Sequence, residues 1–215
     1  MSDQGARLLL LRHAHVDTGP DGGRLCGWLD LPLSPRGEQQ IAAFEHGPPN
    51  HAPTALYTSP LLRAVTTAHV LARRWNITPI YDDALREIFC GDFEGRLLRD
   101  IQHHHPEIWA RNAAQNDNHF AWPGGETYQQ FRDRIVAALS RIAARHPGQR
   151  IAIVTHTGVI TQAVAVFENR PPAAWEHRRA RPFSATELLW RNDAPQDLLS
   201  FNVETWWQES PPPAE

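Results

Sequence analysis

Two short apolar runs in this chain each lead into a histidine. Leu8–Leu11 is followed by Arg12 and His13, and Ile151–Val154 leads through one threonine to His156. Neither run alternates apolar with polar residues, which is typical of strands buried on both faces of a parallel sheet. Because ligands of open α/β sheets bind beyond the carboxyl ends of the strands, we expect the two histidines to converge at that edge.

An arginine is expected at the same edge. The candidate strand Ala55–Tyr57 precedes a helix predicted over Pro60–Trp75, which puts Arg63 on the first helical turn, where backbone N–H groups favour an anion. Arginine offers two parallel donors to phosphate oxygens, and a neutral imidazole is a nucleophile near pH 7. These residue types together predict phosphoryl transfer without a metal, in which arginine carries the charge compensation.

Composition limits the classes of function. The sequence contains no lysine, so all 21 Lys or Arg residues are arginine, which excludes lysine-containing phosphate loops and lysine Schiff bases. The net charge of -3 gives no reason to expect nucleic acid or an anionic membrane as a partner. With no secretion signal or membrane-length apolar run, we expect a cytoplasmic protein that binds a small molecule, with Cys26 and Cys90 as reduced thiols. The sequence makes no prediction of the oligomeric state.

Strands and helices alternate along the chain, which predicts a three-layer α/β fold with a mostly parallel central sheet flanked by helices. Two more helices are expected from apolar residues at helical spacing: Pro35–Phe44 and Gln129–Arg145. Two further strands are expected to form an antiparallel edge around the turn Asn192–Pro195: Thr186–Trp190 and Leu198–Val203.

Residues 91–125 break this alternation with a short helix over Leu98–Trp109, and we expect a small helical insertion over the active site. The sequence therefore predicts one domain over residues 1–208. A Pro-rich tail, residues 209–215, is expected to be flexible.

Six motifs occur in the order in which the histidine phosphatase superfamily carries them, and the chain resembles that family over about residues 7 to 208. Each motif alone is weak, whereas the ordered set is specific. The motifs are Leu10-Leu-Arg-His-Ala14, Gly27-Trp-Leu-Asp-Leu-Pro-Leu-Ser34, Tyr57-Thr-Ser-Pro-Leu-Leu-Arg-Ala64, Leu85-Arg-Glu87 with Gly91-Asp-Phe-Glu-Gly95, Pro123-Gly-Gly-Glu-Thr127 and Thr155-His-Thr-Gly158.

The resemblance implies a role for each of five residues. His13 would become phosphohistidine, and Glu87 would protonate the leaving group and then activate water. Arg12, Arg63 and the catalytic His156 would bind the phosphoryl oxygens, with no metal and no other cofactor. A neutral His13 and a protonated Glu87 predict a bell-shaped pH dependence with a mildly acidic optimum. Four nearby carboxylates remain alternative acids: Asp82, Asp83, Asp92 and Glu94.

Several positions depart from the family pattern where the substrate is expected to bind. Ala14, His15-Val16, Gly19 and Thr157 replace the commoner Gly, Glu-Thr, Asn and Gly. Thr157 and Trp28 are candidate substrate-binding residues, although Trp28 at this position either lines the pocket mouth or covers the core.

Two clusters outside the motifs have simpler interpretations than a ligand site. The triplet His103-His-His105 is expected to be a solvated helix end, because adjacent helical side chains point in different directions and cannot share a metal. Trp206 and Trp207 are expected to pack in the core. Three arginines, Arg178, Arg179 and Arg181, form either a solvated face or a contact for an anionic substrate tail.

The resemblance favours a phosphomonoester hydrolase, and its most specific suggestion is an α-ribazole phosphatase. A bisphosphoglycerate-dependent phosphoglycerate mutase is the alternative, because Arg96, Arg99 and Arg111 of the insertion could hold a second anionic group. A catalytically inactive phosphate-binding protein is the second alternative, and it would require a broken site.

Overall fold

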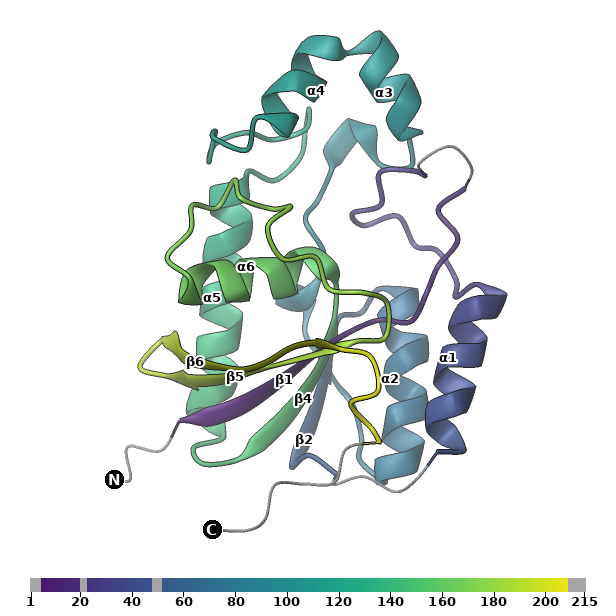
Figure 1. Cartoon of the computed structure of the whole chain (residues 1–215), viewed down its shortest axis with the longest axis vertical. Coiled ribbons are helices and arrows are strands. Elements are labelled where there is room, and N and C mark those ends of the chain that lie inside the picture. Colours follow the sequence, from purple (N-terminus) through teal and green to yellow (C-terminus); the bar gives the residue numbers. More distant parts are fainter. Residues whose placement is uncertain (1–4, 20–22, 48–51, 209–215) are drawn as a thin grey trace.

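A six-stranded sheet with the strand order β3-β2-β4-β1-β5-β6 forms the centre of the molecule (Figure 1). The computed structural model describes residues 5–19, 23–47 and 52–208. The strands are β1 (Ala6–Arg12), β2 (Ala55–Thr58), β3 (Ile80–Tyr81), β4 (Arg150–Thr155), β5 (Ala185–Arg191) and β6 (Ala194–Val203). The first four run parallel, whereas β5 pairs antiparallel with β1 and β6 with β5. The predicted α/β fold, with its mostly parallel sheet and antiparallel edge, is confirmed.

Helices cover both faces of the sheet, with α1 and α2 on one side and α5 and α6 on the other (Figure 1). The α-helices are α1 (Pro35–Glu45), α2 (Leu62–Trp75), α3 (Leu98–His104), α4 (Pro106–Ala113), α5 (Tyr128–Arg145) and α6 (Thr157–Phe167). Two short 3-10 turns, η1 (Asp83–Leu85) and η2 (Gly91–Phe93), lie in the connection between β3 and α3.

Strand β1 shows why the central strands are apolar without interruption. Leu8 and Leu10 pack against α5 and α6, while Leu9 and Leu11 pack against α1 and α2, and all four are at most 2% exposed. Successive side chains of a strand point to opposite faces, so a sheet covered on both faces needs apolar residues at every position. Each such leucine contributes about 1.5–3 kcal/mol through burial.

The segment between β3 and α5 differs in detail from the expectation. One helix was predicted over Leu98–Trp109, but the chain forms α3 and α4, which are separated at His105. Pro106 disfavours helical backbone in the residue before it and suits the first turn of a new helix, so it both ends α3 and begins α4. Most residues of a third apolar cluster come from this segment between β3 and α5, and the cluster is separate from the two that flank the sheet.

The C-terminal hairpin turns earlier than predicted. Asn192 and Asp193 alone form the turn, with φ angles of 51° and 62°, and β6 already begins at Ala194. A two-residue turn with both φ angles positive matches the twist of a hairpin, and Asn and Asp tolerate this conformation well.

Several smaller expectations can also be compared with the structure. Trp206 and Trp207 are buried against α1 and α2, as predicted, and both cysteines are free thiols. Helix α2 begins two residues later than expected, and the helix α6 and the short strand β3 were not predicted. The tail at 209–215 lies outside the described residues. None of the helices in the described ranges has the length and hydropathy that a membrane crossing requires.

Candidate active site

The carboxyl ends of three adjacent parallel strands bring the predicted site together. Arg12 pairs in register with Thr155, and the backbone N–H of His13 then donates to the Thr155 carbonyl oxygen at 2.9 Å. The rings of His13 and His156 lie 5.2 Å apart between their centroids. The topology thus produces the convergence that the two histidine-terminated apolar runs predicted.

His13 is held so that one ring nitrogen faces Arg63. Its Nδ1 lies 2.7 Å from the Ala14 carbonyl oxygen, which can only accept, so Nδ1 carries the proton and Nε2 carries the lone pair. The Arg63 Nε–H donates to that Nε2 at 3.2 Å. Burial, followed by the charges of Arg63 and Arg12, lowers the pKa of His13 well below its usual value. The ring is therefore neutral at pH 7, as a nitrogen nucleophile must be.

Arg63 is buried and anchored by the loop that contains Trp28. Its Nη1 and Nη2 donate to the carbonyl oxygens of Leu29 and Gly27 at 2.8 and 2.7 Å. Glu94 holds this loop in turn, because its carboxylate accepts four backbone N–H groups, at 2.7–3.1 Å, from residues 27, 28, 29 and 90. From the sequence, Glu94 was an alternative to Glu87 as the proton donor, and no sequence pattern indicated that Glu94 would anchor this loop.

His156 is oriented by Ser59, which follows β2. The Leu61 N–H donates to Ser59 Oγ at 3.4 Å, and Ser59 Oγ lies 2.8 Å from His156 Nε2. The serine hydroxyl can therefore donate to Nε2, which leaves the proton on Nδ1. His156 Nδ1 is buried and has no hydrogen-bond partner within the described part of the chain. Burial, with Arg63 and His13 next, lowers the pKa of His156 well below its usual value.

Glu87 is a buried carboxylate in the same cavity. Its Oε1 accepts from the Ile88 N–H and its Oε2 from the Gly158 N–H, both at 3.0 Å. A Cβ atom at position 158 would lie 2.0 Å from Oε1, so glycine is required there for Glu87 to occupy this position. The Glu87 backbone carbonyl oxygen accepts from Arg134 Nη2 at 3.2 Å, and Arg134 also binds the carbonyl oxygens of residues 84 and 86.

The other four carboxylates that were considered as acids have different surroundings. Asp82 caps η1 and pairs with Arg141, and Asp83 pairs with Arg86. Of the five acidic residues that the sequence offered, only Glu87 is among the described residues that line the cavity. The cavity has a volume of about 430 Å³ and is also lined by Arg12, His13, Arg63 and Thr157.

The sequence profile of the histidine phosphatase superfamily (branch 1) matches residues 8–203, a span that contains every residue of this site. The chain belongs to this superfamily. A phosphoserine phosphatase 1 of Hydrogenobacter thermophilus is 30% identical over 151 residues, 70% of this chain and 71% of that protein. A probable phosphoglycerate mutase of Salmonella paratyphi C is 29% identical over 175 residues, 81% of this chain and 80% of that protein.

Solved structures of similar fold also include phosphatases. A mycobacterial glucosyl-3-phosphoglycerate phosphatase superposes with a TM-score of 0.79 at 28% identity, covering 92% of this chain and 98% of that one. The α-ribazole phosphatase of Shigella flexneri superposes with a TM-score of 0.79 at 25% identity, covering 92% and 96%. Together with the family match, these phosphatase relatives identify the protein as a phosphatase enzyme.

Arg12 completes the cationic side of this histidine phosphatase site. Its Nη1 donates to the Ala180 carbonyl oxygen at 2.7 Å, which also accepts from Thr157 Oγ1 at 3.4 Å. Burial lowers the pKa of Arg12 to about 10, while Glu87 opposes this shift, so the guanidinium remains charged at pH 7. Arg12 Nε is buried without a partner among the described residues.

Trp28 lies beside the site and contacts the backbone of Glu87. The indole Nε1–H donates to the Glu87 carbonyl oxygen at 2.8 Å, and the ring packs 4.9 Å from Phe89. The ring is 38% exposed and is not among the described residues that line the cavity. Its contacts therefore hold the backbone of Glu87, a placement that neither sequence interpretation of Trp28 described.

The residues that depart from the family pattern make local contacts. Ala14 is fully buried and donates to Thr67 Oγ1 at 3.1 Å, and His15 Nδ1 lies 2.7 Å from Ser34 Oγ. Gly19 has a φ of 93° and donates to Asp17 Oδ1. Ala14, His15 and Gly19 thus support the loop between β1 and α1, whereas Val16 and Thr157 line the cavity itself.

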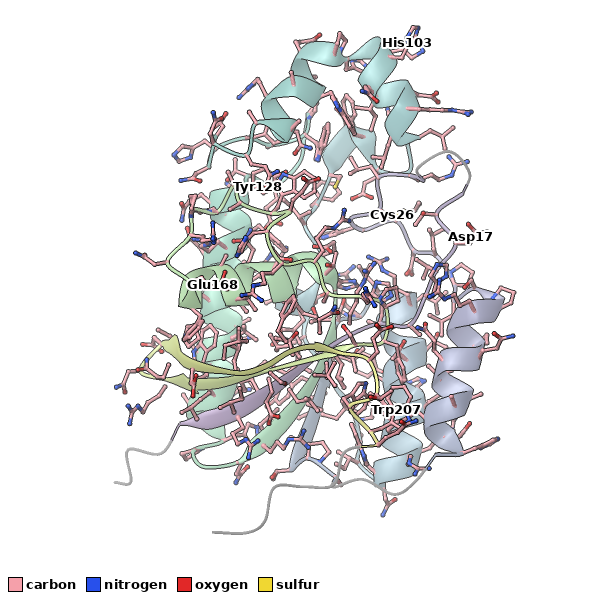
Figure 2. The ribbon with its side chains drawn as sticks, in the orientation of Figure 1. Asp17, Cys26, His103, Tyr128, Glu168 and Trp207 are labelled. Atoms are coloured by element: carbon pink, nitrogen blue, oxygen red, sulfur yellow. The ribbon has the colours of Figure 1, made fainter. Side chains whose placement is uncertain are left out.

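The arginine and histidine clusters outside the motifs differ in their distance from the cavity. Of the three arginines that were candidates for binding an anionic tail, Arg179 lines the cavity, whereas Arg178 pairs with Glu168 and Arg181 with Glu204. The exposed His103 lies at the far end of the molecule from the sheet (Figure 2). In the described ranges, no group of three or more His, Cys, Asp or Glu side chains is arranged to hold a metal.

Proposed function

We propose that this enzyme hydrolyses a small phosphomonoester through a phosphohistidine at His13 Nε2, without a metal. The observation that carries the proposal is the position of His13 Nε2, which is unprotonated, buried and 3.2 Å from the Arg63 Nε–H. A nucleophilic lone pair is thereby placed beside a fixed cation that can bind the phosphoryl oxygens.

In the first proposed step, His13 Nε2 attacks phosphorus while the bond to the ester oxygen breaks. Protonated Glu87 gives its proton to the departing oxygen, and the Ala14 carbonyl oxygen stabilises the proton retained on Nδ1. In the second step, the Glu87 carboxylate removes a proton from water, whose oxygen attacks phosphorus. The N–P bond breaks, which releases inorganic phosphate and restores neutral His13.

Three groups would stabilise the charge on the equatorial oxygens during both steps. Arg12 and Arg63, which line the cavity, supply positive charge. His156 is not among the described residues that line the cavity, but its ring lies 5.2 Å from that of His13, and its unpartnered Nδ1–H would supply a fixed donor. Arg12 Nε, also unpartnered, adds a second free donor. Because these donors are held by the protein before the substrate binds, they need no reorganisation during the reaction.

The cavity supports hydrolysis over mutase activity. The three arginines that could have held a second phosphate, Arg96, Arg99 and Arg111, are absent from the described residues that line it. Arg96 binds the Asp92 carbonyl oxygen, and Arg111 pairs with Asp117. An inactive phosphate-binding protein is not favoured either, because all five candidate residues for binding and catalysis are present.

The proposed substrate is a small soluble metabolite, and α-ribazole phosphate enters the test because of the similarity to the Shigella flexneri enzyme. The proposed location is the cytoplasm, with no nucleic acid or membrane as a partner. We also propose a single domain over residues 1–208, in which 91–125 covers the active site.

A panel of phosphomonoesters assayed with and without 2,3-bisphosphoglycerate tests this function. The panel contains α-ribazole phosphate, 3-phosphoglycerate, phosphoserine and sugar phosphates, with EDTA present. Release of inorganic phosphate without the bisphosphate is the expected result. Isomerisation of 3-phosphoglycerate that requires the bisphosphate would identify a mutase, and the absence of any turnover would indicate a binding protein.

A further inference from the structure

The cavity continues from the phosphate-binding residues into a compartment with aromatic walls. We define the aromatic compartment by six lining residues, which come from α3, α4, the connection between α4 and α5, the start of α5 and the loop after α6: Leu98, Trp109, Asn112, Trp122, Tyr128 and Trp175. In Figure 2, Tyr128 lies between the sheet and the helices α3 and α4. Arg12, His13 and Arg63 line the same cavity from the carboxyl ends of the strands and the start of α2, so we infer that the alcohol part of a bound ester extends into this compartment.

The aromatic compartment is uncharged. All six of its side chains are neutral, and each is buried or half-buried. Apart from the phosphate-site residues Arg12, Arg63 and Glu87, the charged residues that line the cavity are Arg24, Glu176 and Arg179, and all three are exposed. The guanidinium of Arg179 lies 5.8 Å from the centroid of the Trp175 ring but is exposed to solvent. A carboxylate or second phosphate buried in the compartment would therefore lose its water without gaining a buried cation, which is unfavourable. A flat apolar ring would gain burial there.

A single amide in the aromatic compartment is oriented by the protein. The Tyr128 hydroxyl donates to Asn112 Oδ1, and the Trp175 indole N–H donates to the Asn112 backbone carbonyl oxygen at 3.4 Å. Asn112 and Tyr128 are each only 7% exposed. With Oδ1 accepting from Tyr128, the Nδ2 group is the remaining polar group of an oriented amide that lines the cavity, and it can donate to a bound ligand.

We propose that the aromatic compartment selects phosphomonoesters of uncharged alcohols that carry an aromatic or heteroaromatic ring, and that Asn112 Nδ2 donates a hydrogen bond to an acceptor on that ring. Asn112 is then a specificity-determining residue, and Tyr128 is a positioning residue that holds it. The inference rests on the proposed function, because it assigns the alcohol side of the ester that His13 attacks.

The experiment compares esters that differ only in the alcohol. Benzyl phosphate supplies a ring without an acceptor, the three pyridylmethyl phosphates add a ring nitrogen at each position, and 3-phosphoglycerate supplies a carboxylate. We expect kcat/KM for benzyl phosphate to exceed that for 3-phosphoglycerate by about tenfold or more, from burial of the ring. The best pyridylmethyl ester should exceed benzyl phosphate by about threefold to tenfold, the usual net effect of one hydrogen bond.

Substitutions test whether the side-chain amide of Asn112 causes the preference for pyridylmethyl esters over benzyl phosphate. Asn112→Ala should abolish the advantage of the pyridylmethyl ester over benzyl phosphate, and Tyr128→Phe should reduce it, mainly through KM. Glu107→Gln, an exposed position on α4, is the matched control and should leave all the ratios unchanged. Tyr128→Phe retains the ring, so it tests the role of Asn112 even if Asn112→Ala does not fold.

The possible failures are distinguishable. Hydrolysis of 3-phosphoglycerate as fast as that of benzyl phosphate would overturn the aromatic preference while leaving the proposed function intact. An equal loss for every ester in Asn112→Ala would show that Asn112 only supports the fold. If no ester is hydrolysed and no phosphate appears on His13, the proposed function itself fails.

Discussion

Replacing Gly158 with alanine tests whether the position of Glu87 controls leaving-group protonation. The new Cβ atom would lie 2.0 Å from Glu87 Oε1, and real Cβ atoms essentially never come closer than 3.0 Å, so the carboxylate must move by about 1 Å or more. Displacement of a catalytic group by 1 Å costs about 100-fold in rate. Gly158 is the second residue of α6 and does not have a left-handed backbone conformation, so alanine is compatible with the backbone there and folding should be preserved.

The assay is steady-state hydrolysis of two esters with different leaving groups, together with thermal unfolding. Gly158→Ala should lower kcat/KM, which reports the step that releases the alcohol, about 100-fold for an alkyl phosphate and much less for 4-nitrophenyl phosphate, whose leaving group needs no proton. In the Glu87→Gln background the same substitution should have little further effect, because the two changes act on one group. Equal losses for both esters, or full additivity with Glu87→Gln, would refute this reasoning.

Three other predictions follow from the contacts around the site. Glu94→Gln should lower the free energy of unfolding by about 1.5–3 kcal/mol in urea and reduce kcat/KM, because four backbone donors lose a charged acceptor and Arg63 loses its anchored loop; unchanged stability would contradict this role. Ser59→Ala should reduce kcat/KM about tenfold, because His156 loses the group that orients it; kinetics like those of the wild type would mean that Ser59 is dispensable. Because burial lowers the pKa of His13 and His156 in the folded state, the unfolded chain binds more protons below about pH 6.5. Stability should therefore fall as the pH decreases from 6.5 toward 5, by up to about 1.4 kcal/mol per pH unit for each histidine; a flat urea-unfolding profile over this range would contradict it.

Local patterns were sufficient to predict the strands that carry the site. The uninterrupted apolar residues of β1 and β4 required burial on both faces, and the parallel arrangement then fixed where His13 and His156 would lie. The antiparallel edge was predictable from a different local signal, two strand patterns joined by a turn at Asn192. These features depend on short stretches of sequence whose physical consequences are the same in any α/β fold.

The supporting residues could not be predicted in this way. Glu94 anchors the loop that holds Arg63, and its four donors come from residues distant in sequence as well as from Cys90 nearby. The contact of Ser59 with His156 joins positions 97 residues apart. The indole of Trp28 donates to a backbone carbonyl oxygen 59 residues away, a contact that no spacing rule encodes.

The most direct test of the mechanism is rapid-quench labelling with an ester that carries radioactive phosphate. The wild-type enzyme should acquire acid-labile, base-stable label on His13 within one turnover, at the same level with and without EDTA. Glu87→Gln should form the intermediate more slowly and retain it longer, because both steps use that carboxyl group. His13→Ala should remain unlabelled, and labelling of this variant at the wild-type level would contradict the assignment of His13 as the nucleophile.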